Sequence, residues 1–131
     1  MPIVFKIHPD ANLVEIVCSG TVTDEQVSSW ITELQAHQNF KASLDTLSDC
    51  REITENQVTG PGLIEASFND PSSGTIRRAI VVARDLEVGR GNQYARAVSD
   101  TPDNFIITKS MEEALSFLGI GNLPEGSIIR P

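Results

Sequence analysis

The sequence has few of the residues from which metal centres and disulfide frameworks are built. It contains two cysteines and two histidines. The cysteines, Cys18 and Cys50, form no CxxC pair and have no zinc-type spacing to the histidines. We expect both to be free thiols, as in a reducing compartment. The sequence therefore predicts no metal site and no cofactor.

Positive charge and long apolar runs are also scarce. Ten Lys and Arg oppose eighteen Asp and Glu, which gives a formal net charge of -8. Such a balance disfavours contact with nucleic-acid phosphates or anionic membrane surfaces. No apolar run approaches the ~18 residues of a membrane span, and the first ten residues lack a basic leader followed by an apolar stretch. We expect a cytoplasmic protein with no membrane span and no nucleic-acid partner.

The length and the composition are those of one globular domain. The chain has 131 residues, of which 40% are hydrophobic and 21% charged, close to the average for soluble domains. We expect a single domain over residues 1–120. Residues 121–131 show no periodicity and are predicted to be a tail that runs loosely over the surface.

Changes of hydrophobic period divide the chain into strands and helices. A hairpin is expected first, and Thr23 with Gln26 forms a capping box before an amphipathic helix. Thr59 is expected to cap a second helix, and Ser110 with Glu113 a last one, which Gly119 ends in a left-handed conformation. The glycines at 89 and 91 are expected to confine the regular part of the third helix to residues from 92 onward. The expected strands are residues 3–8, 13–19, 44–50, 79–83 and 105–107, and the expected helices are residues 24–38, 60–68, 87–98 and 111–118.

Residues 79–83, Ala-Ile-Val-Val-Ala, form an uninterrupted run of small and β-branched side chains. Such a run is typical of a parallel strand covered on both faces, so we expect it at the centre of the fold. The element order is ββαβαβαβα. It predicts an α/β domain with a mixed five-stranded sheet, an N-terminal β-hairpin and about four helices.

Three segments carry a resemblance to a known family. They are residues 47–51, Leu-Ser-Asp-Cys-Arg; residues 77–82, Arg-Arg-Ala-Ile-Val-Val, before Asp-Leu; and residues 111–118, Met-Glu-Glu-Ala-Leu-Ser-Phe-Leu. With the element order, the chain resembles small bacterial STAS/SEC14-like proteins of the anti-anti-sigma-factor-like, or SpoIIAA-like, fold. The resemblance implies a non-enzymatic domain that serves regulated protein contact or holds an apolar ligand.

The phosphorylation switch of anti-anti-sigma factors uses an Asp-Ser pair after the third strand. Here residues 49–54 read Asp-Cys-Arg-Glu-Ile-Thr, so that pair is missing. Thr54 is the nearest hydroxyl, but Glu52 and Glu55 would repel a phosphate there. We therefore predict no phosphorylation site.

The basic residues of the chain are concentrated in residues 77–96. Five arginines oppose Asp85 and Glu87 in this segment, which makes it locally +3 and leaves -11 for the rest of the net -8. It is the favourable place for an anionic headgroup or an acidic partner, unless its arginines pair with nearby carboxylates. A glycine-rich segment, Gly-Arg-Gly-Asn at 89–92, precedes Tyr94, which stands where a dinucleotide loop needs its third glycine.

Asp49 and Arg51 lie at the carboxyl end of a predicted strand, where open α/β sheets bind ligands. A structural ion pair between them is the alternative. Together with the basic segment, this position gives the candidate ligand-binding residues Arg51, Arg84, Arg90, Asn92 and Tyr94.

Two functions are compatible with these patterns. The first is a non-catalytic binding or regulatory module for protein–protein interaction, a homodimer formed through a sheet edge or a helix face. The alternative is a carrier of a small amphipathic or lipid-like ligand, with its apolar part between helix and sheet and its anionic end near Arg84, Arg90 and Asn92. Trp30 lies on an apolar helical stripe that is either core, a dimer contact or the lid of such a cavity. No nucleophile, base and orienting group can be assembled, so we predict that the protein is not an enzyme.

Overall fold

The computed structural model describes residues 2–98 and 102–129, with the backbone alone at residues 86, 90, 91, 93, 95 and 102. Its strands form one five-stranded sheet in the order β1-β2-β3-β4-β5. The first two strands pair antiparallel as a hairpin, and all later neighbours pair parallel. The strands are β1 (Ile3–His8), β2 (Leu13–Val22), β3 (Asp45–Asn56), β4 (Arg78–Val81) and β5 (Phe105–Thr108). The mixed sheet with an N-terminal hairpin confirms the predicted fold class.

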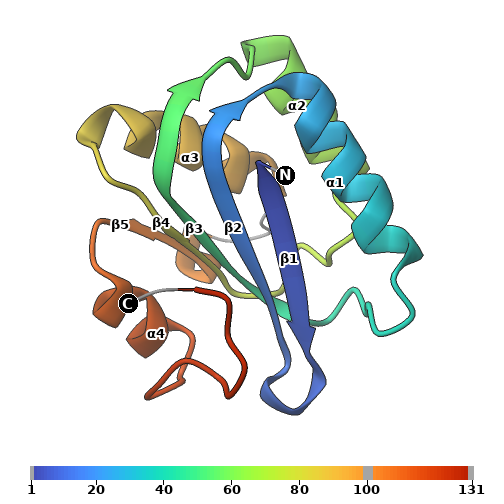
Figure 1. The fold of residues 1–131 in the computed structure, drawn as a ribbon, viewed down its shortest axis with the longest axis vertical. Coiled ribbons are helices and arrows are strands. Elements are labelled where there is room, and N and C mark those ends of the chain that lie inside the picture. Colours follow the sequence, from blue (N-terminus) through green and yellow to red (C-terminus); the bar gives the residue numbers. More distant parts are fainter. Residues whose placement is uncertain (1, 99–101, 130–131) are drawn as a thin grey trace.

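The helices cover the two faces of the sheet unequally (Figure 1). One face carries α1 (Asp24–Ala36), α2 (Gly60–Asn69) and α3 (Asp85–Val98). The other face carries the short α4 (Met111–Phe117) and the C-terminal segment, residues 121–129. Short 3₁₀ turns at Pro9–Ala11 and Pro102–Asn104 precede β2 and β5.

Side-chain alternation along the strands divides the interior into two cores. Val14 and Ile16 of β2 pack with α1 on one face. Leu13 of β2 and Leu47 of β3 point to the opposite face and pack with α4. Because successive strand residues point to opposite faces, each strand contributes to both cores, and the sheet separates them.

Local side-chain bonds begin the helices where the sequence predicts. Thr23 and Gln26 form the reciprocal capping box of α1, and Thr59 accepts the Gly62 N–H at the start of α2. Ser110 accepts the Glu113 N–H at α4, but the Glu113 side chain accepts a hydrogen bond from Thr108 instead of closing the box. Gly119 has the expected left-handed backbone, with φ of 75°.

Two expectations about the sheet are wrong. The run at 79–83 is not at the centre: β4 is the fourth of five strands, and β3 is central. The run is apolar because β4 still lies between β3 and β5 and is covered on both faces. The strand expected at 44–50 continues to Asn56 because its polar residues pair with β2, which is also longer than expected, across two irregularities in register.

Two expectations about the helices and the chain end are also wrong. The third helix begins at Asp85, before both glycines, so their cost of about 1 kcal/mol each does not delay it; the buried Glu87, held by Arg84, lies in its first turn. The C-terminal segment is not loose. Ile129 is 4% exposed in the core beneath α4, and Ser127 and the Ile128 N–H donate to the buried carboxylate of Glu15.

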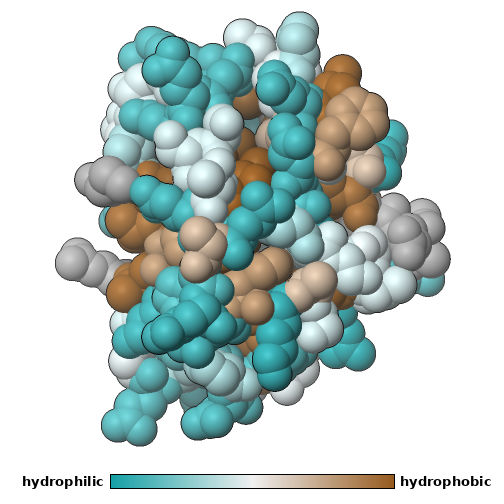
Figure 2. Space-filling view, turned by 90° about the vertical axis from the view of Figure 1, so that its right-hand side faces the viewer, coloured by the Kyte–Doolittle hydropathy of each residue, from teal (hydrophilic) through white to brown (hydrophobic). Residues whose placement is uncertain are grey.

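Some large apolar side chains stay at the surface. Seen from the side on which α1 lies, the surface is mainly hydrophilic, with apolar atoms gathered near its upper end and across its middle (Figure 2). On α2, Phe68 is 84% exposed and Ile64 is 48% exposed. One helical turn separates them, so they present one apolar face of α2 to the solvent.

Candidate functional site

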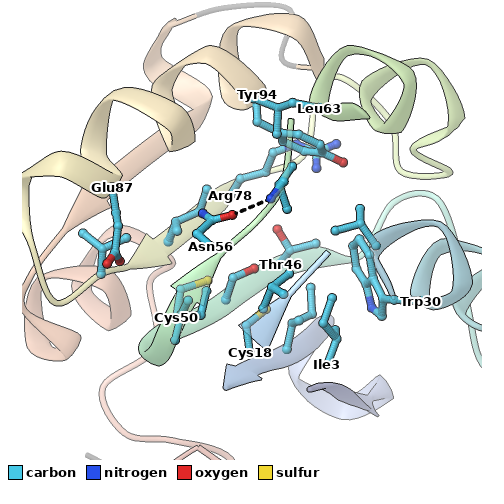
Figure 3. A pocket seen from close by; sticks show the side chains of 18 of the residues that line it. Ile3, Cys18, Trp30, Thr46, Cys50, Asn56, Leu63, Arg78, Glu87 and Tyr94 are labelled. Carbon is cyan, nitrogen blue, oxygen red and sulfur yellow. Dashed lines mark hydrogen bonds between the residues drawn. The ribbon is translucent and has the colours of Figure 1, made fainter. Parts of the chain in front are cut away.

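A cavity of about 190 Å³ lies between the sheet and the three helices on its face (Figure 3). Its floor is formed by β2, β3 and β4, through residues such as Ile16, Ser48 and Ile80. Trp30 of α1 and Leu63 of α2 form walls, and α3 contributes two more wall residues, Glu87 and Tyr94. The lining is mostly apolar, with a few polar groups, as in sites for small molecules.

The cavity exists because the central strand has short side chains on this face. Thr46, Ser48 and Cys50 of β3 point into it, while Leu47 points to the opposite core. The neighbouring strands place Ile16 and Ile80 beside Ser48. Since the short β3 side chains do not reach the helices, a space remains above the middle of the sheet.

A charged cluster closes one side of the cavity. Arg78 at the start of β4 donates from Nη1 to Asp70 Oδ2 over 3.1 Å and from Nη2 to Oδ1 over 3.4 Å. The hydroxyl of Tyr94 donates to the same carboxylate. Burial, and then the negative charge of Asp70, raises the pKa of Tyr94 well above its ordinary value. The Tyr94 hydroxyl therefore stays protonated and donates its hydrogen bond to Asp70.

A second charged pair, Glu87 with Arg84, lies at one end of the cavity, where α3 begins. Arg84 donates to Glu87 Oε1 from Nε over 2.8 Å and from Nη2 over 2.7 Å. Glu87 is 8% exposed, and its other oxygen, Oε2, is buried with no partner among the described residues. The Arg84 guanidinium itself stays largely in solvent.

Three buried polar atoms have no hydrogen-bond partner among the described residues, and all three belong to side chains that line this cavity. They are Trp30 Nε1, Arg78 Nε and Glu87 Oε2. Native proteins rarely leave buried polar groups unpaired, and each such group costs about 1–3 kcal/mol. Their gathering around one cavity is the strongest sign of a binding site in the described part of the chain.

The two cysteines also lie on this cavity, on adjacent strands. Both are free thiols. The hydrogen bond with Cys18, then burial, then the charges of Asp49 and Glu87 raise the pKa of Cys50 well above its ordinary value. A raised pKa leaves little thiolate at neutral pH, which makes Cys50 a poor nucleophile. Across the described residues no three His, Cys, Asp or Glu side chains gather as metal ligands.

The structure brings one of the predicted ligand residues, Tyr94, to the cavity. Arg51 instead forms a bidentate ion pair with Asp49, over 2.9 and 2.8 Å, which is the structural alternative that the sequence left open. Arg84 is held by Glu87, and Asn92 lies on α3 away from the cavity lining. Arg90 lies on α3, but its side chain is outside the described residues.

The sequence does not single out the residues that give the cavity its polar groups. Arg78, Asp70 and Glu87 contribute to the charge count of their segments and have no distinguishing motif. The available signal is a charge immediately beside an apolar strand: Arg78 precedes the run at 79–83, and Glu87 follows it by four residues. Arg78 and Glu87 are buried, whereas Arg84 and Asp85, which directly follow the run, are exposed, so position beside the strand does not by itself identify the cavity residues.

Comparisons with known proteins identify the fold. No family model and no curated protein matches the chain. A solved structure does match: an uncharacterised protein of the DUF3478 family from Shewanella loihica PV-4, described as having a SpoIIAA-like fold. It is 16% identical, the match covers 88% of this chain and 93% of that chain, and the TM-score is 0.54. The chain has a SpoIIAA-like fold.

This SpoIIAA-like fold confirms the resemblance drawn from residues 47–51, 77–82 and 111–118. The likeness concerns the arrangement of strands and helices, because folds host many unrelated functions. In the part of the chain that the structure describes, every helix is too short or too polar to cross a membrane.

Proposed function

We propose that this SpoIIAA-like domain binds a small, mainly apolar molecule in the cavity between the sheet and helices α1, α2 and α3. The observation that carries the proposal is the gathering of three unpaired buried polar atoms around one apolar cavity. A ligand with matching polar atoms would pair them and recover the free energy that their burial costs.

The size of the cavity restricts the ligand. A volume of about 190 Å³ is somewhat larger than a cavity of about 150 Å³ that holds benzene. We infer a molecule of the size of one ring or a short chain. This is smaller than the lipid-like cargo that the sequence suggests as an alternative.

The same groups favour binding without chemistry. The Cys50 thiol is kept protonated by its surroundings, the Tyr94 phenol is fixed on Asp70, and the Glu87 carboxylate is held by Arg84. A nucleophile needs an adjacent base that activates it. Here the thiol stays protonated, and the phenol and the carboxylate are already bonded to Asp70 and Arg84. These contacts support a non-catalytic role.

Filling the cavity tests this proposal. Ile80→Phe adds a ring to the cavity floor, whereas Ile106→Phe makes the same change on the neighbouring strand, on the face packed against α4. Native mass spectrometry of protein purified from cells is expected to show a bound small molecule on the wild type and on Ile106→Phe, and none on Ile80→Phe. Equal retention by both variants would place the ligand elsewhere, and a clean unliganded wild-type mass would refute the proposal.

A second candidate function is protein–protein interaction through α2. Its support is the exposed apolar pair Ile64 and Phe68, because exposed apolar patches often mark interaction sites. The same mass spectrum tests it: a mass twice that of one chain favours a homodimer. Loss of the doubled mass in Phe68→Ser would assign the contact to this face of α2.

A further inference from the structure

The charges around the cavity already form pairs of opposite sign. Asp70 neutralises Arg78 on one side, and Arg84 neutralises Glu87 at the end near α3. An ion entering this mostly apolar space would find no uncompensated partner, and burying an unpaired charge is costly. The pairing therefore selects an uncharged ligand. The outcome differs from the anionic end expected near Arg84, because Glu87 occupies that guanidinium.

The unpaired oxygen of Glu87 needs a donor. A carboxylate offers only acceptor atoms, and while Oε1 receives two hydrogen bonds from Arg84, Oε2 receives none from the described residues. The other two unpaired atoms, Arg78 Nε and Trp30 Nε1, are donors. To pair all three atoms, bound molecules would have to donate a hydrogen bond to Glu87 Oε2 and accept hydrogen bonds from Arg78 Nε and Trp30 Nε1.

Resting on the proposed function, we propose that the ligand is a small uncharged molecule with a hydroxyl group, whose hydrogen is donated to Glu87 Oε2. A hydroxyl group carries one hydrogen that it can donate, so it pairs the unpaired acceptor Glu87 Oε2, whereas the donors Arg78 Nε and Trp30 Nε1 lie further along the cavity. Figure 3 shows Glu87 at one end of the cavity and Trp30 at the other, with Arg78 between them. The apolar body of the ligand extends from Glu87 toward Trp30, above the short side chains of β3.

The single tryptophan of the chain provides the measurement. Trp30 lines the cavity, and its indole N–H gives one NMR signal that reports occupancy. The protein is titrated with phenol, with toluene, which replaces the hydroxyl by a methyl group, and with benzoate as an anion. Phenol is expected to bind about tenfold more tightly than toluene, as a hydrogen bond to a charged acceptor predicts, and benzoate more weakly than phenol.

Replacing the acceptor tests its role. Glu87→Met keeps the side chain's length and removes both oxygens, so the preference for phenol over toluene is expected to disappear while toluene binding remains. Glu112→Met, an exposed position on α4, is the matched control and is expected to keep the preference. If Glu87→Met does not fold, the ratio of the phenol and toluene affinities measured on the wild type still tests whether the ligand site prefers a hydroxyl group.

The outcomes separate this inference from the proposed function. Equal affinity for phenol and toluene, or tighter binding of benzoate, overturns the hydroxyl assignment and leaves the cavity as a binding site. A preference for phenol that survives in Glu87→Met overturns the role of Glu87. If no probe moves the Trp30 signal, the proposed function falls as well.

Discussion

At the scale of single residues, two side chains that line the cavity and ionise at high pH link the cavity to stability. The Tyr94 phenol and the Cys50 thiol both have a pKa raised by their surroundings, from ordinary values of 10.0 and 9.0. In each case the folded state holds its proton more firmly than the unfolded chain does. Their contribution to stability is therefore complete below the ordinary pKa values and is lost as the pH rises above them.

Tyr94, the single tyrosine of the chain, predicts how stability changes at alkaline pH. We expect the free energy of unfolding to fall above about pH 10 by up to about 1.4 kcal/mol per pH unit from this group. Denaturant titrations over a pH series measure that slope, and absorbance reports the tyrosinate. Tyrosinate is expected to appear only together with unfolding, and Tyr94→Phe is expected to lack this part of the slope. A tyrosinate signal near pH 10 from folded protein would contradict the prediction.

At the scale of elements, one carboxylate joins the beginnings of two helices. Asp24 in the first turn of α1 accepts the Thr59 N–H over 3.0 Å and the Thr59 hydroxyl over 2.7 Å. The Thr59 hydroxyl in turn accepts the Gly62 N–H of α2 over 2.9 Å. The bonds fix α2 beside α1, and Leu63 of α2 forms a wall of the cavity. The cap of one helix therefore also positions part of the site.

Alanine substitutions at two glycines of α2 separate the effect of the Asp24–Thr59 contact on stability from the effect of helix propensity. Alanine is favoured over glycine in helices by about 1 kcal/mol, and Gly60→Ala, which meets no atom within 4 Å, is expected to be neutral or stabilising. A Cβ at Gly62 would lie 2.1 Å from the Asp24 carboxylate. Gly62→Ala is expected to displace Asp24 and to cost about 1–2 kcal/mol through the lost hydrogen bonds. Thermal unfolding of both variants measures the difference; a more stable Gly62→Ala would disprove the coupling.

The elements that could be predicted from sequence are those with local causes. The capping box at Thr23 and the left-handed Gly119 depend on neighbours a few residues away, and both are confirmed. Features that depend on distant partners escaped prediction. The end of β3 is polar and is a strand only because β2 pairs with it. The burial of Ile129 goes with hydrogen bonds from the C-terminal segment to Glu15, which is 112 residues from Ser127.

The candidate site was predicted least well for the same reason. Tyr94 was identified, but the cavity arises from short side chains of β3 beneath three helices, and its polar groups come from α1, β4 and α3. Sequence charge indicated an anion site at Arg84 because pairing partners in space are not visible in a charge count. In the structure Glu87, three residues further on, takes that guanidinium.

At the scale of the whole molecule, the sheet separates the proposed binding cavity from a second core on the opposite face. The cavity lies under α1, α2 and α3, whereas the core under α4 is closed by the C-terminal segment through Ile129. Glu15 secures that closure, since it is fully buried and accepts hydrogen bonds from Ser127 and from the Ile128 N–H. Substitutions in the core under α4 should therefore change stability without changing binding in the cavity.

Two adjacent isoleucines test this separation. Ile129 is 4% exposed and Ile128 is 38% exposed, so Ile129→Ala is expected to cost about 2–5 kcal/mol through the lost core contacts, and Ile128→Ala about 0.5 kcal/mol or less. Denaturant unfolding measures both. Because the sheet lies between Ile129 and the cavity, folded Ile129→Ala is expected to bind phenol with wild-type affinity, unlike Ile80→Phe. A parallel loss of phenol affinity in Ile129→Ala would mean that the two faces are coupled through β3, the strand that contributes Leu47 to one core and Ser48 to the cavity floor.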